Sequence, residues 1–182
     1  MKIWRLGLLG LLLVCIMTPA ETIPEWKVFT SNKEHFSVRY PASWRRIQSD
    51  VDFLHIVNFP QSAKIKVLAF PPGGAEIVVQ EAKEHYSSID EWIKKDSRFG
   101  AKVIGRHVIK RPNAKADACT TFVEVITKTD IGLPARFIGT SYYCSVHDHL
   151  FVIGLGNWQW DSRQKQLQAL TLKIARSLRV SQ

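Results

Sequence analysis

The sequence lacks the short motifs by which many enzymes and cofactor-binding domains are recognised. Neither the nucleophile-elbow pattern Gly-x-Ser-x-Gly nor the zinc-protease pattern His-Glu-x-x-His occurs in it. Gly154 and Gly156 do not form a dinucleotide fingerprint, because the third glycine is missing and no helix follows in a βαβ unit. We therefore expect no catalytic residues and no cofactor, with an enzyme that uses an unrecognised site as the alternative.

The apolar run from Leu6 to Met17 is too short for a membrane span, which needs ~20 residues. Lys2 and Arg5 precede this run, and Thr18-Pro19-Ala20 follows it. A positive end, an apolar core and small residues before a cut are the pattern of a secretory signal. The sequence therefore predicts export and cleavage after Ala20, with a retained membrane helix as the alternative.

Cys15 introduces a second possible fate for this segment. A lipoprotein signal places its cysteine after a small residue, whereas Val14 precedes Cys15 here. We therefore assign Cys15 to the discarded segment and place the protein in the periplasm first, with secretion second and lipid anchoring through Cys15 disfavoured. The expected organisation is a signal peptide over residues 1–20, a tether over 21–25 and one domain over 26–182, with no membrane span after cleavage.

The chain is basic, and it stays basic after cleavage. The full sequence has 25 Lys and Arg against 16 Asp and Glu, and residues 1–20 remove Lys2 and Arg5, which leaves 23 − 16 = +7. This sign favours contact with anionic surfaces, although it also serves solubility alone. No basic stripe is interleaved with aromatic residues, so we expect no nucleic acid as a partner. The partners expected instead are an envelope protein or a small ligand, and no pattern indicates an oligomeric state.

Two cysteines, Cys119 and Cys144, remain in the expected mature chain. An even count in an exported protein indicates a disulfide. If 118–128 and 134–146 form a hairpin that turns between Ile131 and Gly132, residues whose numbers sum to 263 face each other. Cys119 and Cys144 would then lie directly across the hairpin, within reach of a bond. Two buried free thiols are the alternative.

Short segments rich in β-branched and aromatic residues predict many strands. Besides the hairpin, the expected strands are 26–29, 36–40, 44–48, 53–59, 63–70, 75–80, 102–109 and 149–155. Ser88-Ile89-Asp90-Glu91 is a capping-box pattern that predicts a short middle helix ending before Gly100.

A last helix is expected to start at Asp161, with Gln164 as its capping partner. Its apolar positions follow helical spacing, which favours packing on a sheet. The predicted fold class is therefore α+β: an antiparallel sheet of about six to nine strands with both helices packed on it.

The segment from Phe36 to Trp44, with the letters FSVRYPASW, resembles the opening of PsbP-like and DcrB-like domains. The later order of a Ser-Ile-Asp-Glu-Trp helix, a long hairpin, a strand and a final helix is similar too, so the resemblance covers most of residues 26–180. That superfamily includes extrinsic photosystem subunits, a nuclear-transport adaptor and exported bacterial proteins. The resemblance implies a non-catalytic accessory or binding domain and transfers no functional residue.

His147-Asp148-His149 is the first candidate site, because it falls at a predicted turn, where binding residues often lie. Two imidazoles with a carboxylate between them are typical of part of a divalent-metal site, although the third ligand would have to come from another loop. The alternative is a polar turn with exposed histidines.

Trp158 and Trp160 form the second candidate site. Gly154 and Gly156 precede them, and glycines let a partner approach the backbone closely, while two tryptophans offer an aromatic platform. The alternative is a strand end whose tryptophans cover the sheet edge or the last helix.

Overall fold

The computed structural model describes residues 25–47, 53–60, 71, 73–82, 86–96, 101–130, 136–158 and 161–181. The expected signal peptide, its cleavage site and most of the tether lie outside these ranges, as does the strand expected at 63–70. No helix of the described residues is long and apolar enough to cross a membrane.

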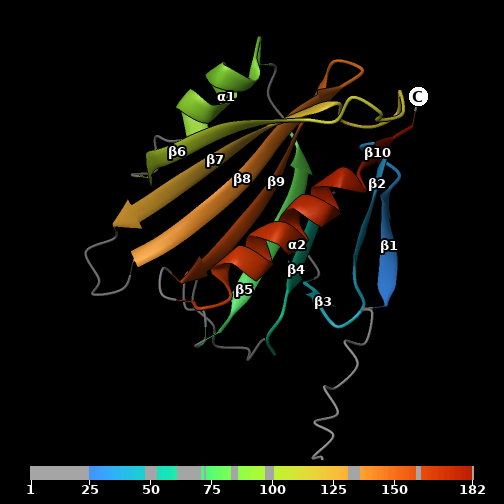
Figure 1. Ribbon diagram of the computed structural model, residues 1–182. Coiled ribbons are helices and arrows are strands. Elements are labelled where there is room, and N and C mark those ends of the chain that lie inside the picture. The colour runs from blue at the N-terminus through green and yellow to red at the C-terminus, as the bar shows by residue number, and fades with distance from the viewer. Residues whose placement is uncertain are drawn as a thin grey trace, which may run out of the picture.

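The described chain forms two antiparallel sheets and two helices (Figure 1). The larger sheet has seven strands in the order β3-β4-β5-β9-β8-β7-β6, and the smaller has three in the order β1-β2-β10. The strands of the larger sheet are β3 (Arg45–Arg46), β4 (Leu54–Val57), β5 (Ala75–Glu81), β6 (Ala101–Lys110), β7 (Thr121–Asp130), β8 (Arg136–Val146) and β9 (His149–Trp158). Those of the smaller sheet are β1 (Trp26–Ser31), β2 (Phe36–Pro41) and β10 (Arg179–Val180).

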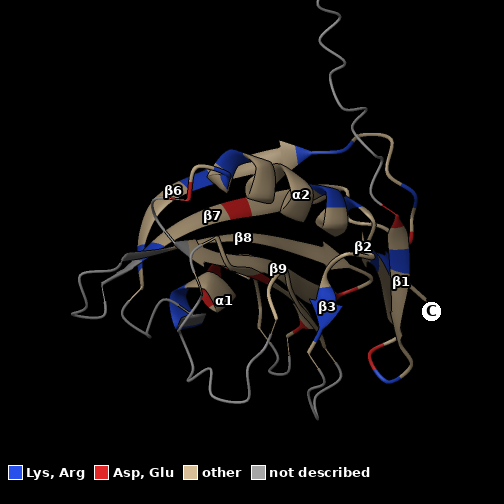
Figure 2. Cartoon of the chain, turned by 90° about the horizontal axis from the view of Figure 1, so that it is seen from below, with Lys and Arg blue, Asp and Glu red and all other residues tan. Residues whose placement is uncertain are grey.

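The helices α1 (Ile89–Asp96) and α2 (Gln164–Arg176) lie on opposite faces of the larger sheet (Figure 2). Under α2, the main core joins both sheets, and the rings of Phe36 and Phe151 meet edge to face at 5.5 Å. Under α1, a smaller core contains Trp92 and Tyr143, whose rings meet edge to face at 5.3 Å. The α+β class is therefore confirmed, and the strands expected in one sheet are divided between two.

The start of α1 follows the predicted capping box. The main-chain N–H of Glu91 donates to Ser88 Oγ at 3.1 Å, which satisfies a first-turn donor. The carboxylate of Glu91 accepts from the main chain and the hydroxyl of Ser87, both at 2.8 Å. The box therefore closes one residue earlier than the pattern alone predicts.

The predicted start of α2 at Asp161 is wrong. The helix begins at Gln164, and the carboxylate of Asp161 is occupied by Arg163, whose main-chain N–H donates to Oδ1 at 2.9 Å. The side chain of Arg163 binds the same carboxylate, and these hydrogen bonds lower the pKa of Asp161. Asp161 thus stabilises the turn before the helix instead of capping it.

The predicted register of the β7–β8 hairpin is also wrong. Val123 faces Tyr143 and Asp130 faces Arg136, so facing residues sum to 266 instead of 263. The strand β7 begins at Thr121, and the chain before it turns at Lys115, whose main-chain oxygen accepts from Ala118 N at 3.0 Å.

The expected cysteine pair nevertheless forms. The sulfurs of Cys119 and Cys144 lie 2.12 Å apart, and their Cα atoms lie 5.9 Å apart, at disulfide distance. Because Cys119 precedes β7, it reaches Cys144 from the turn at Lys115 and not from the hairpin ladder. The two cysteines therefore lie at disulfide distance, although the register from which their pairing was predicted does not occur.

Candidate functional site

The sequence-predicted metal site is a tight turn at one end of the larger sheet. His147 and Asp148 form the two-residue connection between β8 and β9, with φ values of 49° and 66°. Positive φ at both positions is typical of the type I′ hairpin turn. The turn conformation is therefore a structural reason, independent of any metal, for the residues at positions 147 and 148. His149 Nδ1 lies 2.5 Å from Glu81 Oε1 on β5, so this imidazole already has a carboxylate partner.

In the parts of the chain that the structure describes, no three or more His, Cys, Asp or Glu residues are grouped to hold a metal ion. The metal site expected at His147, Asp148 and His149 therefore stays a prediction.

The second sequence-predicted site stays a prediction. Gly154 and Gly156 lie inside β9, opposite Ser141 and Gly139 of β8, and not in a loop. The side chain of Trp158 and the whole of Trp160 lie outside the described residues.

A groove of about 660 Å³ runs between the outer face of the smaller sheet and the end of α2. Its lining combines four cations with an aromatic ring, an exposed aliphatic side chain and two hydroxyls, and contains no acidic residue. The lining residues are Trp26, Val28, Ser37, Val38, Arg39, Lys173, Arg176, Ser177 and Arg179. We call this surface the basic groove.

Strand periodicity places one wall of the basic groove. In β1, Trp26 and Val28 point to the outer face while Phe29 is buried on the other, as side chains alternate along a strand. Val28 is 63% exposed, which is high for an aliphatic side chain. In β2, Arg39 faces Val28 in the register and is exposed on the same outer face.

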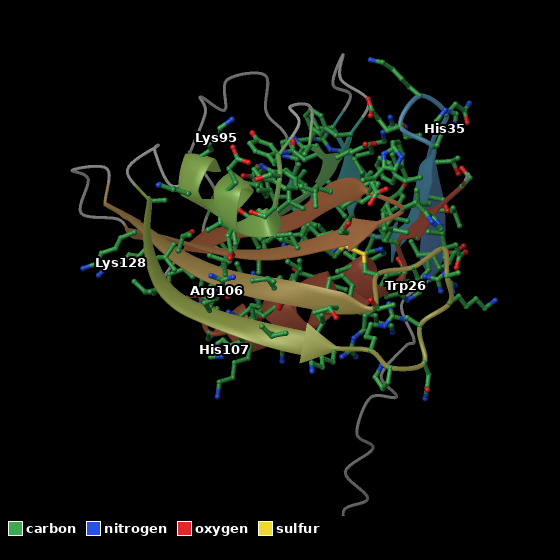
Figure 3. All side chains as sticks on the ribbon, turned by 90° about the horizontal axis from the view of Figure 1, so that it is seen from above. Trp26, His35, Lys95, Arg106, His107 and Lys128 are labelled. Carbon is green, nitrogen blue, oxygen red and sulfur yellow. A yellow bond between two sulfur atoms is a disulfide. The ribbon has the colours of Figure 1, made fainter. Side chains whose placement is uncertain are left out.

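The polar side of α2 supplies the other wall. Ile174 and Ala175 are buried against the sheets, which leaves Lys173 and Arg176 exposed at the edge of the helix. Lys173 Nζ lies 4.8 Å from the centroid of the Trp26 ring, so a cation–π contact joins the two walls. Figure 3 shows Trp26 beside β1, away from α1 and its Lys95.

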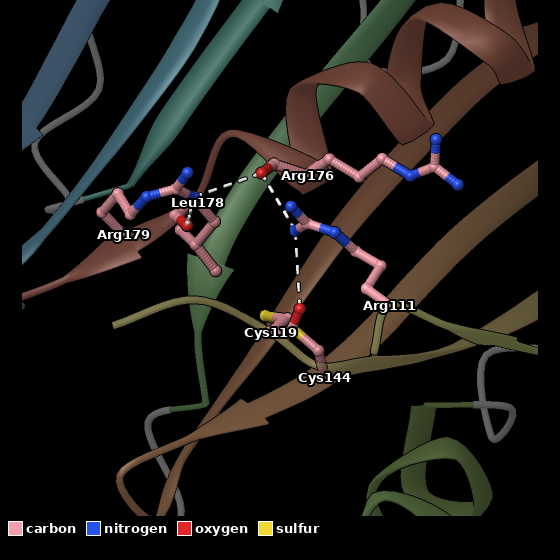
Figure 4. Close-up of a disulfide and its surroundings, with 6 residues drawn as sticks. All are labelled: Arg111, Cys119, Cys144, Arg176, Leu178 and Arg179. Carbon is pink, nitrogen blue, oxygen red and sulfur yellow. Dashed lines mark hydrogen bonds between the residues drawn. A yellow bond between two sulfur atoms is a disulfide. The ribbon is translucent and has the colours of Figure 1, made fainter. Parts of the chain in front are cut away.

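Three arginines meet where α2 ends (Figure 4). Arg111 Nη1 donates to the main-chain oxygen of Arg176 at 3.1 Å, and Arg179 Nη1 donates to the same oxygen at 3.2 Å. Burial first, and then the charges of Arg179 and Arg176, lower the pKa of Arg111. The part of this shift that comes from Arg179 and Arg176 reflects like charges held close together, which a bound anion would offset.

Most of this charge has no acidic partner within the described chain. Asp117 Oδ2 lies 3.6 Å from Arg179 Nε, whereas Arg39, Lys173 and Arg176 form no ion pair with a described acidic side chain. The basic groove can therefore attract an acidic group, and its apolar wall at Trp26 and Val28 can bury part of one.

Sequence reasoning did not identify the basic groove, because its residues come from both ends of the domain. The signals available were the exposed position of Arg39 in an alternating strand and the cations at the end of the last helix. Only the pairing of β10 with β2, in which Arg179 faces Ser37, brings them together.

No family model matches this sequence, and no curated protein matches it. Among solved structures, the chain is similar to the Ran-binding protein Mog1p of Saccharomyces cerevisiae, with a TM-score of 0.56, 11% identity and coverage of 86% of this chain and 96% of that chain. A mutant of Mog1 gives a TM-score of 0.54, at the same identity and coverage.

The chain is also similar to cyanobacterial PsbP of Synechocystis, with a TM-score of 0.51, 11% identity and coverage of 90% of this chain and 97% of that chain. At these identities the likeness concerns the fold. The fold implied by the resemblance at residues 36–44 is thereby confirmed, because the described chain has a fold similar to those of PsbP and Mog1p.

Proposed function

We propose that this protein is an exported, non-catalytic binding domain that docks on an acidic segment of a partner protein through the basic groove. The observation that carries the proposal is the composition of the groove, with four cations, an aromatic ring and no acidic residue in its lining. Charge of one sign in a hollow surface steers an oppositely charged partner and selects it.

The groove favours binding over catalysis. Its lining holds no His, Cys, Asp or Glu residue to act as a base or an activated nucleophile. The hydroxyl of Ser177 donates to the main-chain oxygen of Ile174 at 2.6 Å, which commits it to the end of the helix. The structurally similar Mog1p is a Ran-binding protein, so this fold can serve protein recognition.

Export is proposed from the residue pattern of positions 1–20 and is compatible with the Cys119–Cys144 pair. The mass of the protein purified from the producing cells tests this part. A chain that begins at Glu21 supports it. A chain that retains residues 1–20, or one that begins at Cys15 and carries acyl groups, would contradict it.

The docking function is tested with a fluorescent decapeptide in which Glu and Val alternate, and with a matched peptide that carries Lys in place of Glu. We expect the acidic peptide to bind and to weaken with added salt, because exposed charges are screened. The variant R39Q/R176Q removes two cations of the groove that pair with no described acidic side chain. The control K102Q/K165Q makes the same charge change on exposed residues outside the groove. Equal losses in both variants, or binding of the basic peptide, would overturn the proposal.

A further inference from the structure

The strand β1 is the outer strand of the smaller sheet. Within the described chain it pairs with β2 on one side, from Trp26 opposite Pro41 to Ser31 opposite Phe36, without a break in the register. Figure 1 shows it at the side of the molecule, with no described element beyond it.

The direction of the free main-chain groups of β1 follows from the bonds of β2. The main-chain N–H of Arg39 donates to Ser177 Oγ at 2.9 Å, so it points toward the end of α2 and away from β1. Val28, opposite Arg39, is therefore in a non-hydrogen-bonded pair, in which the N–H and C=O of both residues point outward.

The start of the ladder agrees with this assignment. Ala42 N donates to Glu25 O at 2.7 Å, which makes residue 25 a bonded position and places Trp26, Val28 and Thr30 at the alternate positions. The main-chain groups of these three residues thus face the free edge of the sheet. The side chains of Trp26 and Val28 also line the basic groove, so the free edge and the groove adjoin.

We propose that the partner segment docks as an extended strand beside β1 and places alternate acidic side chains over the basic groove. This inference rests on the proposed function and specifies its binding mode. Strand addition draws its affinity from main-chain hydrogen bonds and its specificity from alternate side chains. The added strand would lie about 10 Å from β2, a distance that a glutamate and an arginine side chain span together.

The other long edge of the molecule is built differently. The strand β6 carries a register shift between Val103 and Gly105, and Lys102, Arg106 and Lys110 are exposed along it. Bulges and edge lysines are devices that block strand pairing. The edge of β1 has no bulge in its register and carries one exposed cation, Lys27, between Trp26 and the exposed Val28. Its outward-facing positions Trp26, Val28 and Thr30 are uncharged.

The substitution Val28→Pro tests the main-chain bond directly. Proline removes the outward N–H of Val28 without removing a β1–β2 hydrogen bond, and edge strands accept proline. Val28→Thr is the side-chain reference, because it changes the same position in the groove wall and keeps the N–H, so that any effect of the side chain alone is measured separately. With the alternating Glu-Val decapeptide as probe, we expect V28P to bind at least about 10-fold more weakly than V28T, because only V28P lacks the outward main-chain hydrogen bond.

Amide hydrogen exchange of the unmodified protein gives a second reading that does not depend on a variant. Saturation with the decapeptide should slow exchange at Val28, whereas Phe29, bonded to β2 already, should change little. If binding is salt-dependent and lost in R39Q/R176Q but unchanged in V28P, with no protection at Val28, the groove function stands and strand addition is overturned. If the decapeptide binds none of the proteins, both proposals fail.

Discussion

Arg111 and Arg176 are joined by a hydrogen bond of 3.1 Å from the guanidinium Nη1 of the first to the main-chain oxygen of the second. The last carbonyls of a helix have no partners within it and carry partial negative charge, so they favour cations. Arg111 also donates to Cys119 O at 3.4 Å. One side chain thus connects the turn that carries Cys119 to the end of α2, and it leaves the guanidinium of Arg176 available to the basic groove.

Replacing Arg111 should destabilise the fold. We expect R111M to lower the free energy of unfolding by about 1–2 kcal/mol, because it removes hydrogen bonds from a charged donor to two main-chain oxygens. Urea denaturation measures the change. K110M is the control, since Lys110 is exposed on the same strand end, and it should stay within about 0.5 kcal/mol of the native protein. Equal changes in the free energy of unfolding for R111M and K110M would show that the hydrogen bonds of Arg111 do not stabilise the fold.

Multivalent anions should stabilise the native protein through the cluster of Arg111, Arg176 and Arg179. An anion that binds the folded state and not the unfolded one raises Tm. Such an anion would offset the charges of Arg179 and Arg176, which, after burial, lower the pKa of Arg111. Thermal unfolding in tripolyphosphate at constant ionic strength checks this. R176Q should lose most of the rise in Tm, and K165Q, its control on the same helix, should keep it. A rise that is equal in all three proteins would contradict the assignment.

Tyr142 should make the protein sensitive to alkaline pH. Its ring is buried, and burial first, then the hydrogen bond and charge of Glu124, raise the pKa of its hydroxyl. Because the pKa is raised in the folded state, the stability from the neutral hydroxyl is fully present below pH ~10 and falls as pH rises above it, by about 1.4 kcal/mol per pH unit.

The variant Y142F isolates this contribution. It removes the hydroxyl that donates to Gln168 O at 3.3 Å, so we expect a loss of about 1 kcal/mol at neutral pH. Urea titrations from pH 8 to 11 should show a shallower decline for Y142F than for the native protein. Parallel declines would mean that other groups cause the alkaline loss.

Removing the cysteine pair should cost stability through the unfolded chain. The pair closes a loop with a sequence separation of 25, for which the chain-entropy model gives about 3–4 kcal/mol. We expect C119A/C144A to lose this amount in denaturant titration. Thiol titration of the unreduced, denatured native protein is the direct check, and two reactive thiols would refute the bond.

Local sequence patterns predicted much of the fold. Strand alternation located β1, β2 and β5, and the Ser88–Glu91 pattern located α1. The register of the β7–β8 hairpin was harder to predict from the sequence, because register depends on turn geometry in addition to strand propensity. The start of α2 was missed because the carboxylate of Asp161 binds the side chain of Arg163. A capping pattern in the sequence does not show whether another side chain already binds the capping residue.

The basic groove was not predictable in the same way. Lys173 and Arg176 can be placed on the exposed side of α2 from helical periodicity, but their nearness to Trp26 depends on how α2 packs beside the smaller sheet. Figure 2 shows Lys and Arg distributed over α2 and β1, segments from the two ends of the domain. The positive charge of the chain could therefore be predicted from the sequence, but the surface on which these cations lie together could not.

Mapping where an acidic ligand binds is the most direct test of the basic groove as the docking site. Nuclear magnetic resonance of the isotope-labelled mature protein, titrated with the alternating Glu-Val decapeptide, reports every amide at once. If the acidic ligand docks in the basic groove beside β1, the largest shifts fall on Trp26, Val28, Arg39 and Arg176. Shifts centred on β6 or on the His147–His149 turn, with the basic groove unchanged, would contradict it.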